Sequence, residues 1–78
     1  MRVFVAADTS VRARLWCEQN KVQIKDYVFV YTESQFKGYH PGDMRIIDLG
    51  FTSPRLMQMM KELKKLGHKV EDFSQWNP

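Results

Sequence analysis

The sequence predicts a single small α/β domain, in two or three layers, built on a four-stranded and mainly parallel sheet. Its 78 residues provide enough chain for one domain only. Short β-branched and aromatic segments alternate with two helical segments, and this alternation implies right-handed crossovers between parallel strands. We therefore expect the order β-α-β-β-α-β with strand order 2-1-3-4. Residues 1–73 should form the domain and residues 74–78 a C-terminal tail.

Two strands and one helix are expected in the first half of the chain. A Val- and Phe-rich strand over 2–7 is followed by the polar triplet 8–10, which suits a helix N-cap. A helix should then run from about Ser10 to Asn20. We expect this helix to lie between the sheet and a second layer, formed by the chain's own tail or by a partner, because both of its sides carry apolar residues. These are Val11, Leu15 and Val22 on one side, and Ala13, Trp16 and Cys17 on the other. The next strand, 27–32, is apolar on both faces, as in a central strand with both faces covered.

The connection to the third strand leaves two topologies open. A helical turn over 33–37 should be followed by a tight turn over 39–43, with the third strand at 44–49. The connection of about eleven residues is close to the minimum for a parallel crossover. A hairpin-like return would instead make the third strand antiparallel and the fold a mixed α/β sandwich.

The second helix has the strongest signals. Thr52 or Ser53 can cap it, Pro54 suits its first position and Gly67 can end it. Its predicted core stripe is Leu56, Met59, Met60, Leu63 and Leu66. A short fourth strand should follow over 68–73.

Composition argues against several classes of protein. No apolar run approaches the roughly 20 residues of a membrane span, and the amino terminus becomes acidic too early for a signal peptide. The single cysteine, Cys17, cannot form an internal disulfide, which is typical of a reducing compartment. We expect a cytoplasmic protein with no membrane partner. His40, His68 and Cys17 are too scattered for a zinc site, so no metal and no cofactor are expected.

Known catalytic patterns are also missing from the sequence. The first strand-to-helix turn, 7–10, has no glycine and therefore does not match a P-loop. Asp48 ends an apolar strand without a second carboxylate beside it, so we expect it to cap a turn or pair with an arginine. The candidate nucleophiles Ser10, Ser53 and Cys17 have no evident base held by a third group. We expect a protein that is not an enzyme, with no catalytic residues.

The sequence repeats Thr-Ser-x-Arg at 9–12 and 52–55, where each copy leaves a strand and opens a helix. This edge of a parallel sheet is where ligands bind, and helix starts favour anions. One interpretation is a site for a phosphate group or an acidic partner. The other is a pair of helix caps, with Asp8 pairing with Arg12. The candidate residues are Thr9, Ser10, Arg12, Thr52, Ser53 and Arg55.

A second candidate surface combines basic and aromatic side chains. The net charge is +3, which is modest for a nucleic-acid-binding protein, and no nucleic-acid-reading motif is present. Five Phe, three Tyr, two Trp and five Met exceed what so small a core needs, and such residues are enriched in protein interfaces. The surface could bind a protein, or a nucleic acid by stacking on its rings. Its expected members are Trp16, Phe36, Lys37, Tyr39, Lys61, Lys64 and Lys65.

Several short patterns together resemble small α/β proteins encoded by bacteriophages. They are Ala13-Arg14 with Trp16 and Asn20, then Tyr27-Val28-Phe29-Val30, then Phe36-Lys37-Gly38-Tyr39, then Arg45-Ile46-Ile47. The resemblance covers most of the chain and implies a Rossmann-like sheet without a known catalytic set. It also implies a phage accessory factor that binds and modulates or inhibits a host nucleic-acid-processing or defence protein. Direct binding of nucleic acid or of a phosphate ligand is the alternative function.

Overall fold

The computed structural model describes residues 1–77, apart from the side chain of Glu33, and Pro78 of the expected tail lies outside this range. The strands are β1 (Arg2–Ala6), β2 (Tyr27–Phe29), β3 (Met44–Asp48) and β4 (Val70–Asp72). The helices are α1 (Ser10–Gln19) and α2 (Pro54–Lys65), and two short 3-10 turns, η1 (Glu33–Phe36) and η2 (Pro41–Asp43), connect β2 to β3.

All four strands are parallel, in the order β2-β1-β3-β4. The central pair, β1 and β3, runs in register from Arg2 opposite Met44 to Ala6 opposite Asp48. The predicted strand order is confirmed, and the parallel alternative for the third strand is the correct one. The expectation that the 27–32 segment is a central strand was wrong, because β2 lies at the edge of the sheet and only residues 27–29 are in strand conformation. The three residues of β2 are half-buried. Val28 is packed on one face of the sheet and Tyr27 and Phe29 on the other, which accounts for the apolar pattern.

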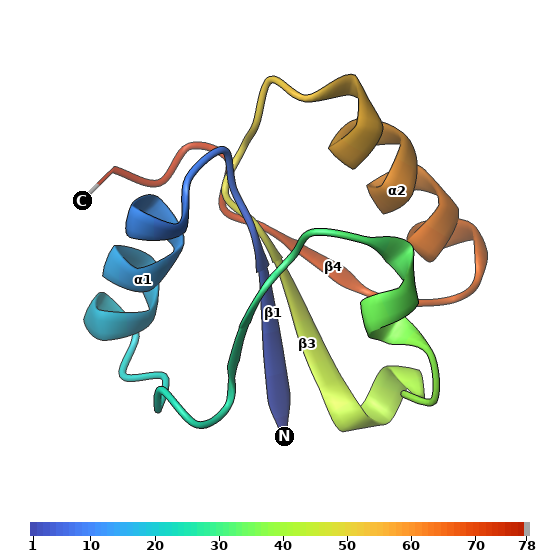
Figure 1. Ribbon diagram of the computed structural model, residues 1–78, viewed down its shortest axis with the longest axis horizontal. Coiled ribbons are helices and arrows are strands. Elements are labelled where there is room, and N and C mark those ends of the chain that lie inside the picture. Colours follow the sequence, from blue (N-terminus) through green and yellow to red (C-terminus); the bar gives the residue numbers. More distant parts are fainter. Residues whose placement is uncertain (78) are drawn as a thin grey trace.

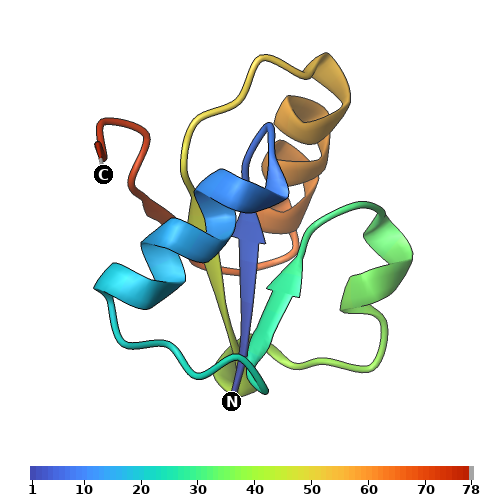
Figure 2. The same cartoon turned by 60° about the vertical axis from the view of Figure 1, so that its left-hand side comes forward.

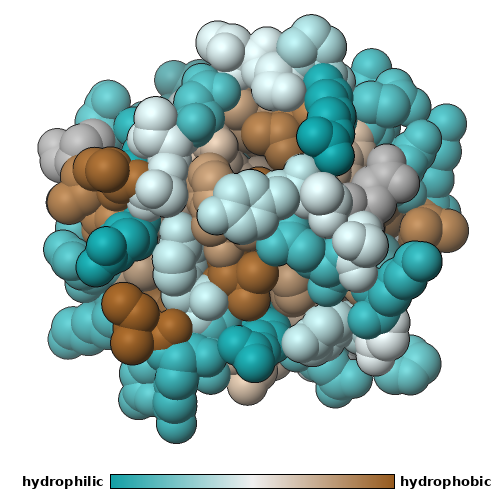
Figure 3. All heavy atoms as spheres, in the orientation of Figure 1, coloured by the Kyte–Doolittle hydropathy of each residue, from teal (hydrophilic) through white to brown (hydrophobic). Residues whose placement is uncertain are grey.

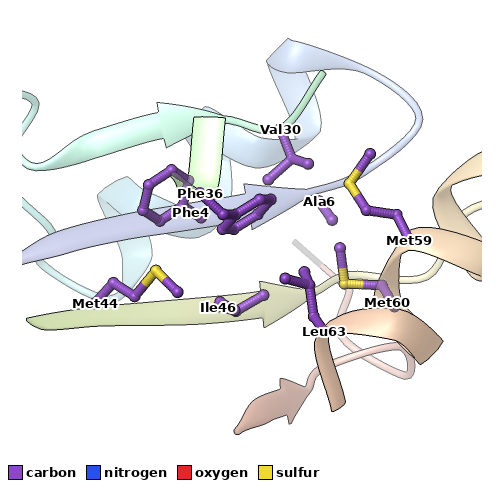
Figure 4. Packing of buried hydrophobic residues seen from close by; sticks show 9 residues of the cluster. All are labelled: Phe4, Ala6, Val30, Phe36, Met44, Ile46, Met59, Met60 and Leu63. Atoms are coloured by element: carbon purple, nitrogen blue, oxygen red, sulfur yellow. The ribbon is translucent and has the colours of Figure 1, made fainter. Parts of the chain in front are cut away.

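The two helices lie on opposite faces of the sheet and give a three-layer domain (Figures 1 and 2). Side chains alternate between the faces along β1, so each face has its own hydrophobic core. One core lies beneath α2 and η1 and is shown in Figure 4: Phe4, Ala6, Val30, Phe36, Met44, Ile46, Met59, Met60 and Leu63. The core on the other face lies beneath α1: Val3, Val5, Ala7, Ala13, Trp16, Cys17, Ile47 and Leu49.

The sheet-facing side of α1 is the one that carries Ala13, Trp16 and Cys17, all of which are buried. On the opposite side Val11 is 68% exposed and Leu15 is 37% exposed. A hydrophobic area over α1, bordered by hydrophilic side chains, is visible in Figure 3. The C-terminal segment packs on the sheet-facing side instead, where the Phe73 ring lies 5.2 Å from that of Trp16. No second layer covers the Val11 side within residues 1–77.

Helix α2 ends in a Schellman motif. Gly67 has φ +92°, its N–H donates to the Lys64 carbonyl at 3.1 Å, and the His68 N–H donates to the Leu63 carbonyl at 3.1 Å. The predicted role of Gly67 is therefore confirmed. Leu66, which was expected in the core stripe, is 74% exposed, because it is the C-cap residue and turns away from the sheet.

Helix α1 ends with the same motif but has a lysine at the left-handed position. Lys21 has φ +57°, and the Val22 N–H donates to the Cys17 carbonyl at 2.9 Å. The left-handed conformation costs a non-glycine residue about 1–2 kcal/mol.

Replacing Lys21 with glycine should remove this cost. We expect Lys21→Gly to raise the free energy of unfolding, measured by urea denaturation, by about 1 kcal/mol. The gain is reduced by the greater entropy that glycine gives to the unfolded chain. The exposed α2 position Lys61 is the control, because Lys61→Gly should lower stability. A Lys21→Gly variant less stable than the parent would contradict this account.

Neither α1 nor α2 has the length and apolar character needed to cross a membrane, and no other helix among the described residues does.

Candidate functional site

Both Thr-Ser-x-Arg segments follow the carboxyl ends of the two central strands, but they open helices on opposite faces of the sheet, so, contrary to the prediction, the two helix starts do not lie side by side (Figures 1 and 2). The segments leave β1 and β3, whose last residues, Ala6 and Asp48, are paired (Figure 1). The Asp8 carboxylate bridges the two loops, since it accepts hydrogen bonds from the Thr52 N–H at 3.0 and 3.3 Å and from the Thr52 hydroxyl at 3.4 Å. The negative charge expected at this edge is thus supplied by the chain itself, and Asp8 does not pair with Arg12.

The hydroxyl groups of this edge act as helix caps. The Thr9 hydroxyl accepts from the Arg12 N–H at 3.2 Å, and the Ser53 hydroxyl accepts from the Leu56 N–H at 3.4 Å. Ser10 is the exposed first residue of α1, and Arg55 is exposed in the first turn of α2. The geometry therefore favours the helix-cap interpretation for both segments.

Arg12 holds the C-terminal segment rather than facing an external anion. Its guanidinium donates to the Leu49 carbonyl at 3.2 Å and to the Trp76 carbonyl at 2.8 Å. It also lies 4.9 Å from the centroid of the Trp76 ring, a cation–π distance. The indole N–H of Trp76 donates to the Gln19 side chain at 3.2 Å. Arginine at this position is thus explained by contacts inside the molecule.

Members of the expected aromatic and basic surface fall on both faces of the sheet. The expectation that Trp16 contacts a partner was wrong, because its side chain is 0% exposed beneath α1. Phe36 is buried on the other face, with its ring 4.7 Å from that of Phe4, and the Tyr39 ring meets Phe4 edge-on at 5.4 Å. The structure does bring Phe36 and Lys37 next to the lysine-bearing helix α2.

Between η1 and the second half of α2 lies a groove of about 530 Å³, here called the α2–η1 groove. Its lining residues are Ser34, Phe36, Lys37, Met59, Glu62, Leu63, Leu66 and His68. Phe36, Met59 and Leu63 are the buried apolar members, whereas Leu66 is exposed. The sequence pattern did not identify this groove. Its two walls, η1 and α2, are separate in the chain, and the connection from β2 to β3 brings η1 next to α2 only in the folded domain.

Of the charged side chains, Lys37 and Glu62 line this groove. Lys61 and Lys65 lie on the exposed surface of α2, near Glu62 in the sequence. Lys61 and Lys65 are one helical turn apart and share the outer face of α2.

Among the side chains that the structure describes, the one ion pair is Arg45–Glu71, at 2.8 Å. The Arg45 guanidinium holds the pKa of the Glu71 carboxyl below its usual value. The pKa of Asp72 is lowered mainly by hydrogen bonds from Ser74, and to a lesser degree by the charge of Lys64.

The other chemically notable side chains have structural roles or stand alone. The Asp48 carboxylate accepts from the Gly50 N–H at 2.7 Å, so it caps a turn, one of its two predicted roles. Burial raises the pKa of the Cys17 thiol, which disfavours a reactive thiolate. Within residues 1–77, no three His, Cys, Asp or Glu side chains are grouped so that they could hold a metal ion.

Comparison of the chain with protein-family models, with curated proteins and with solved structures found no match.

Proposed function

We propose that this chain is a non-enzymatic binding protein that recognises an acidic segment of a partner protein through the α2–η1 groove. The observation that carries the proposal is an apolar hollow with an exposed leucine at its rim and lysines on the adjoining helix face. Interface cores of this kind combine an apolar anchor with a polar or charged rim.

The groove can accept an apolar side chain. Its volume of about 530 Å³ lies within the range of roughly 300–1,000 Å³ found for ligand pockets. Leu66 is 74% exposed, and a partner that covers it would remove apolar surface from water. An aliphatic or aromatic side chain of the partner would contact Leu66 together with Phe36 and Leu63.

The charge beside the groove favours an acidic partner. Lys61 and Lys65 lie on one face of α2, and the whole chain has a net charge of +3. Opposite charges on a partner would speed association, and salt would weaken the attraction. The lining of the groove contains one lysine, Lys37, and one carboxylate, Glu62. Glu62 accepts a hydrogen bond from the Gln58 side chain at 3.3 Å and keeps its negative charge. The excess of positive charge therefore comes from Lys61 and Lys65.

A protein fits this surface better than a nucleic acid. Recognition of single strands relies on aromatic rings on which bases stack. The two candidate rings, Phe36 and Tyr39, pack against Phe4 inside the domain. The resemblance to small bacteriophage proteins directs the search for the partner to host nucleic-acid-processing and defence proteins, which the chain would modulate or inhibit.

The test uses labelled peptides with one central leucine flanked by glutamates. We expect the protein to bind these peptides more tightly than versions with a central serine or with lysine flanks, and the affinity should fall as salt rises. Leu66→Asp should weaken binding at least about tenfold, which corresponds to roughly 1.4 kcal/mol. Fluorescence anisotropy titrations measure each dissociation constant.

Matched controls lie on the α1 side of the molecule. Val11→Asp introduces the same charge at an exposed apolar position and should leave the affinity unchanged. The pair Lys61→Glu and Lys65→Glu should weaken binding, whereas Arg14→Glu with Lys25→Glu changes the net charge equally and should have a smaller effect. Equal binding of all peptides would overturn the proposal. The proposal would also be overturned if the protein bound a single-stranded oligonucleotide tightly, and if this binding were lost in the Lys61→Glu and Lys65→Glu variant but kept in Leu66→Asp.

A further inference from the structure

Strand β2 presents an edge that is suited to pairing with another chain. It is the outermost strand of the sheet in Figure 2, next to β1. The segment 27–32, Tyr-Val-Phe-Val-Tyr-Thr, contains β-forming residues only, with no charge, no proline and no glycine. Six-residue segments of this composition form cross-strand assemblies when their edge is open. This edge therefore needs protection.

The backbone direction shows which groups face outward. The Val30 N–H donates to the Val5 carbonyl at 3.1 Å, so Val30 faces β1. Because successive residues of an extended strand face opposite sides, the backbone groups of Phe29 and Tyr31 point away from the sheet. These outward groups are the ones that an added strand would use.

The side-chain amide of Gln35 already occupies two of these groups. Its Oε1 accepts from the Tyr31 N–H at 2.6 Å, and its Nε2 donates to the Phe29 carbonyl at 2.9 Å. In a parallel ladder, one residue of a neighbouring strand makes the same two bonds, to residues on either side of its partner. The Gln35 amide thus reproduces the hydrogen bonding of one residue of a fifth strand.

Capping of η1 explains only part of this arrangement. Gln35 Oε1 also accepts from the Thr32 N–H at 3.1 Å, at the start of η1, as a capping side chain does. The bond from Gln35 Nε2 to the Phe29 carbonyl lies outside that turn and contributes nothing to the cap. Capping therefore does not explain why the Nε2 group binds the edge of β2.

We infer that Gln35 closes the β2 edge against strand addition by a second copy of this chain. Two copies related by a two-fold axis would pair antiparallel, with Phe29 opposite its own copy. That pairing needs the Phe29 carbonyl and the Tyr31 N–H, the two groups that Gln35 holds. A second copy is the favoured occupant, because it offers the same uncharged segment with no charge to repel it. This inference does not depend on the proposed binding function.

The test compares self-association of Gln35→Ala with that of the parent chain. We expect sedimentation velocity to show larger species for Gln35→Ala as the concentration rises, and thioflavin T fluorescence to increase on prolonged incubation. Adding Tyr31→Lys should restore the parental behaviour, because Tyr31 is 62% exposed and a lysine on an edge strand opposes pairing. Gln35→Met keeps the side-chain length without the hydrogen bonds and serves as the test if Gln35→Ala fails to fold.

Loss of stability alone must be separated from opening of the edge. The control is Val70→Ala, which removes core contacts at β4, the opposite edge of the sheet. Chemical denaturation is used to find conditions in which Val70→Ala and Gln35→Ala have the same stability. Val70→Ala should then self-associate less than Gln35→Ala. Equal association of the two variants, or parental behaviour of folded Gln35→Ala and Gln35→Met, would overturn the inference.

Discussion

Replacing Trp16 with alanine should lower the free energy of unfolding by about 3–5 kcal/mol. Trp16 is the largest of the fully buried side chains and fills the core between α1 and the sheet. Its ring contacts Phe73 edge-on at 5.2 Å, so its loss also loosens the C-terminal segment. A domain of this size has only a few kcal/mol of stability, and we expect Trp16→Ala to be largely unfolded at 25 °C in far-UV circular dichroism.

Trp16→Phe provides the matched comparison. The Trp16 indole N–H is buried and makes no hydrogen bond to the described residues. Phenylalanine keeps much of the apolar contact and removes this unsatisfied donor, whose burial costs roughly 1–3 kcal/mol. Trp16→Phe should therefore lose much less stability than Trp16→Ala. Urea denaturation of the two variants measures the difference, and equal losses would contradict this account.

The second large effect is expected for Phe4→Ala, again about 3–5 kcal/mol. Phe4 is 1% exposed on the central strand β1 and packs against Phe36 (Figure 4). It also packs against Tyr39. Removing its ring leaves a cavity beneath η1, the segment that forms one wall of the α2–η1 groove. Phe4→Ala should thus impair both folding and peptide binding.

Phe4→Leu separates these two consequences. Leucine fills part of the cavity and should retain a cooperative unfolding transition, with a smaller loss of stability. Because Phe36 would lose its aromatic neighbour, peptide binding to folded Phe4→Leu should still be weaker than in the parent chain. Unchanged affinity would show that the position of Phe36 does not depend on Phe4.

The topology of the sheet could be predicted because it depends on local patterns and general rules of chain connection. Alternating strands and helices with right-handed crossovers are compatible with few arrangements, and the order 2-1-3-4 was among them. The capping of α2 by Ser53 and its end at Gly67 are equally local, since each involves residues three to five positions apart. The placement of both Thr-Ser-x-Arg segments at one edge followed from the parallel sheet.

The burial of individual side chains could not be predicted in the same way. The two sides of α1 are both apolar, and only the packing of Phe73 and the sheet shows that Trp16 is internal. The assignment of Leu66 to the core failed because a periodic pattern does not show where a helix turns away from the sheet. Arg12 meets carbonyls 37 and 64 positions along the chain, contacts for which no local signal exists.

By itself, the sequence determined the class of fold, the strand order and the helix ends, because these depend on local backbone preferences and on the pairing of apolar faces. Tertiary structure alone decided which surfaces remain available. Asp8 fills the edge where an external anion was expected, Gln35 covers the edge of β2, and a groove opens between η1 and α2. The Asp8 contact and the groove join segments that come together only when the sheet forms, and such contacts leave no periodic trace in the sequence. Gln35 bonds to residues only four and six positions away, but these groups are at an edge only because the sheet places β2 there.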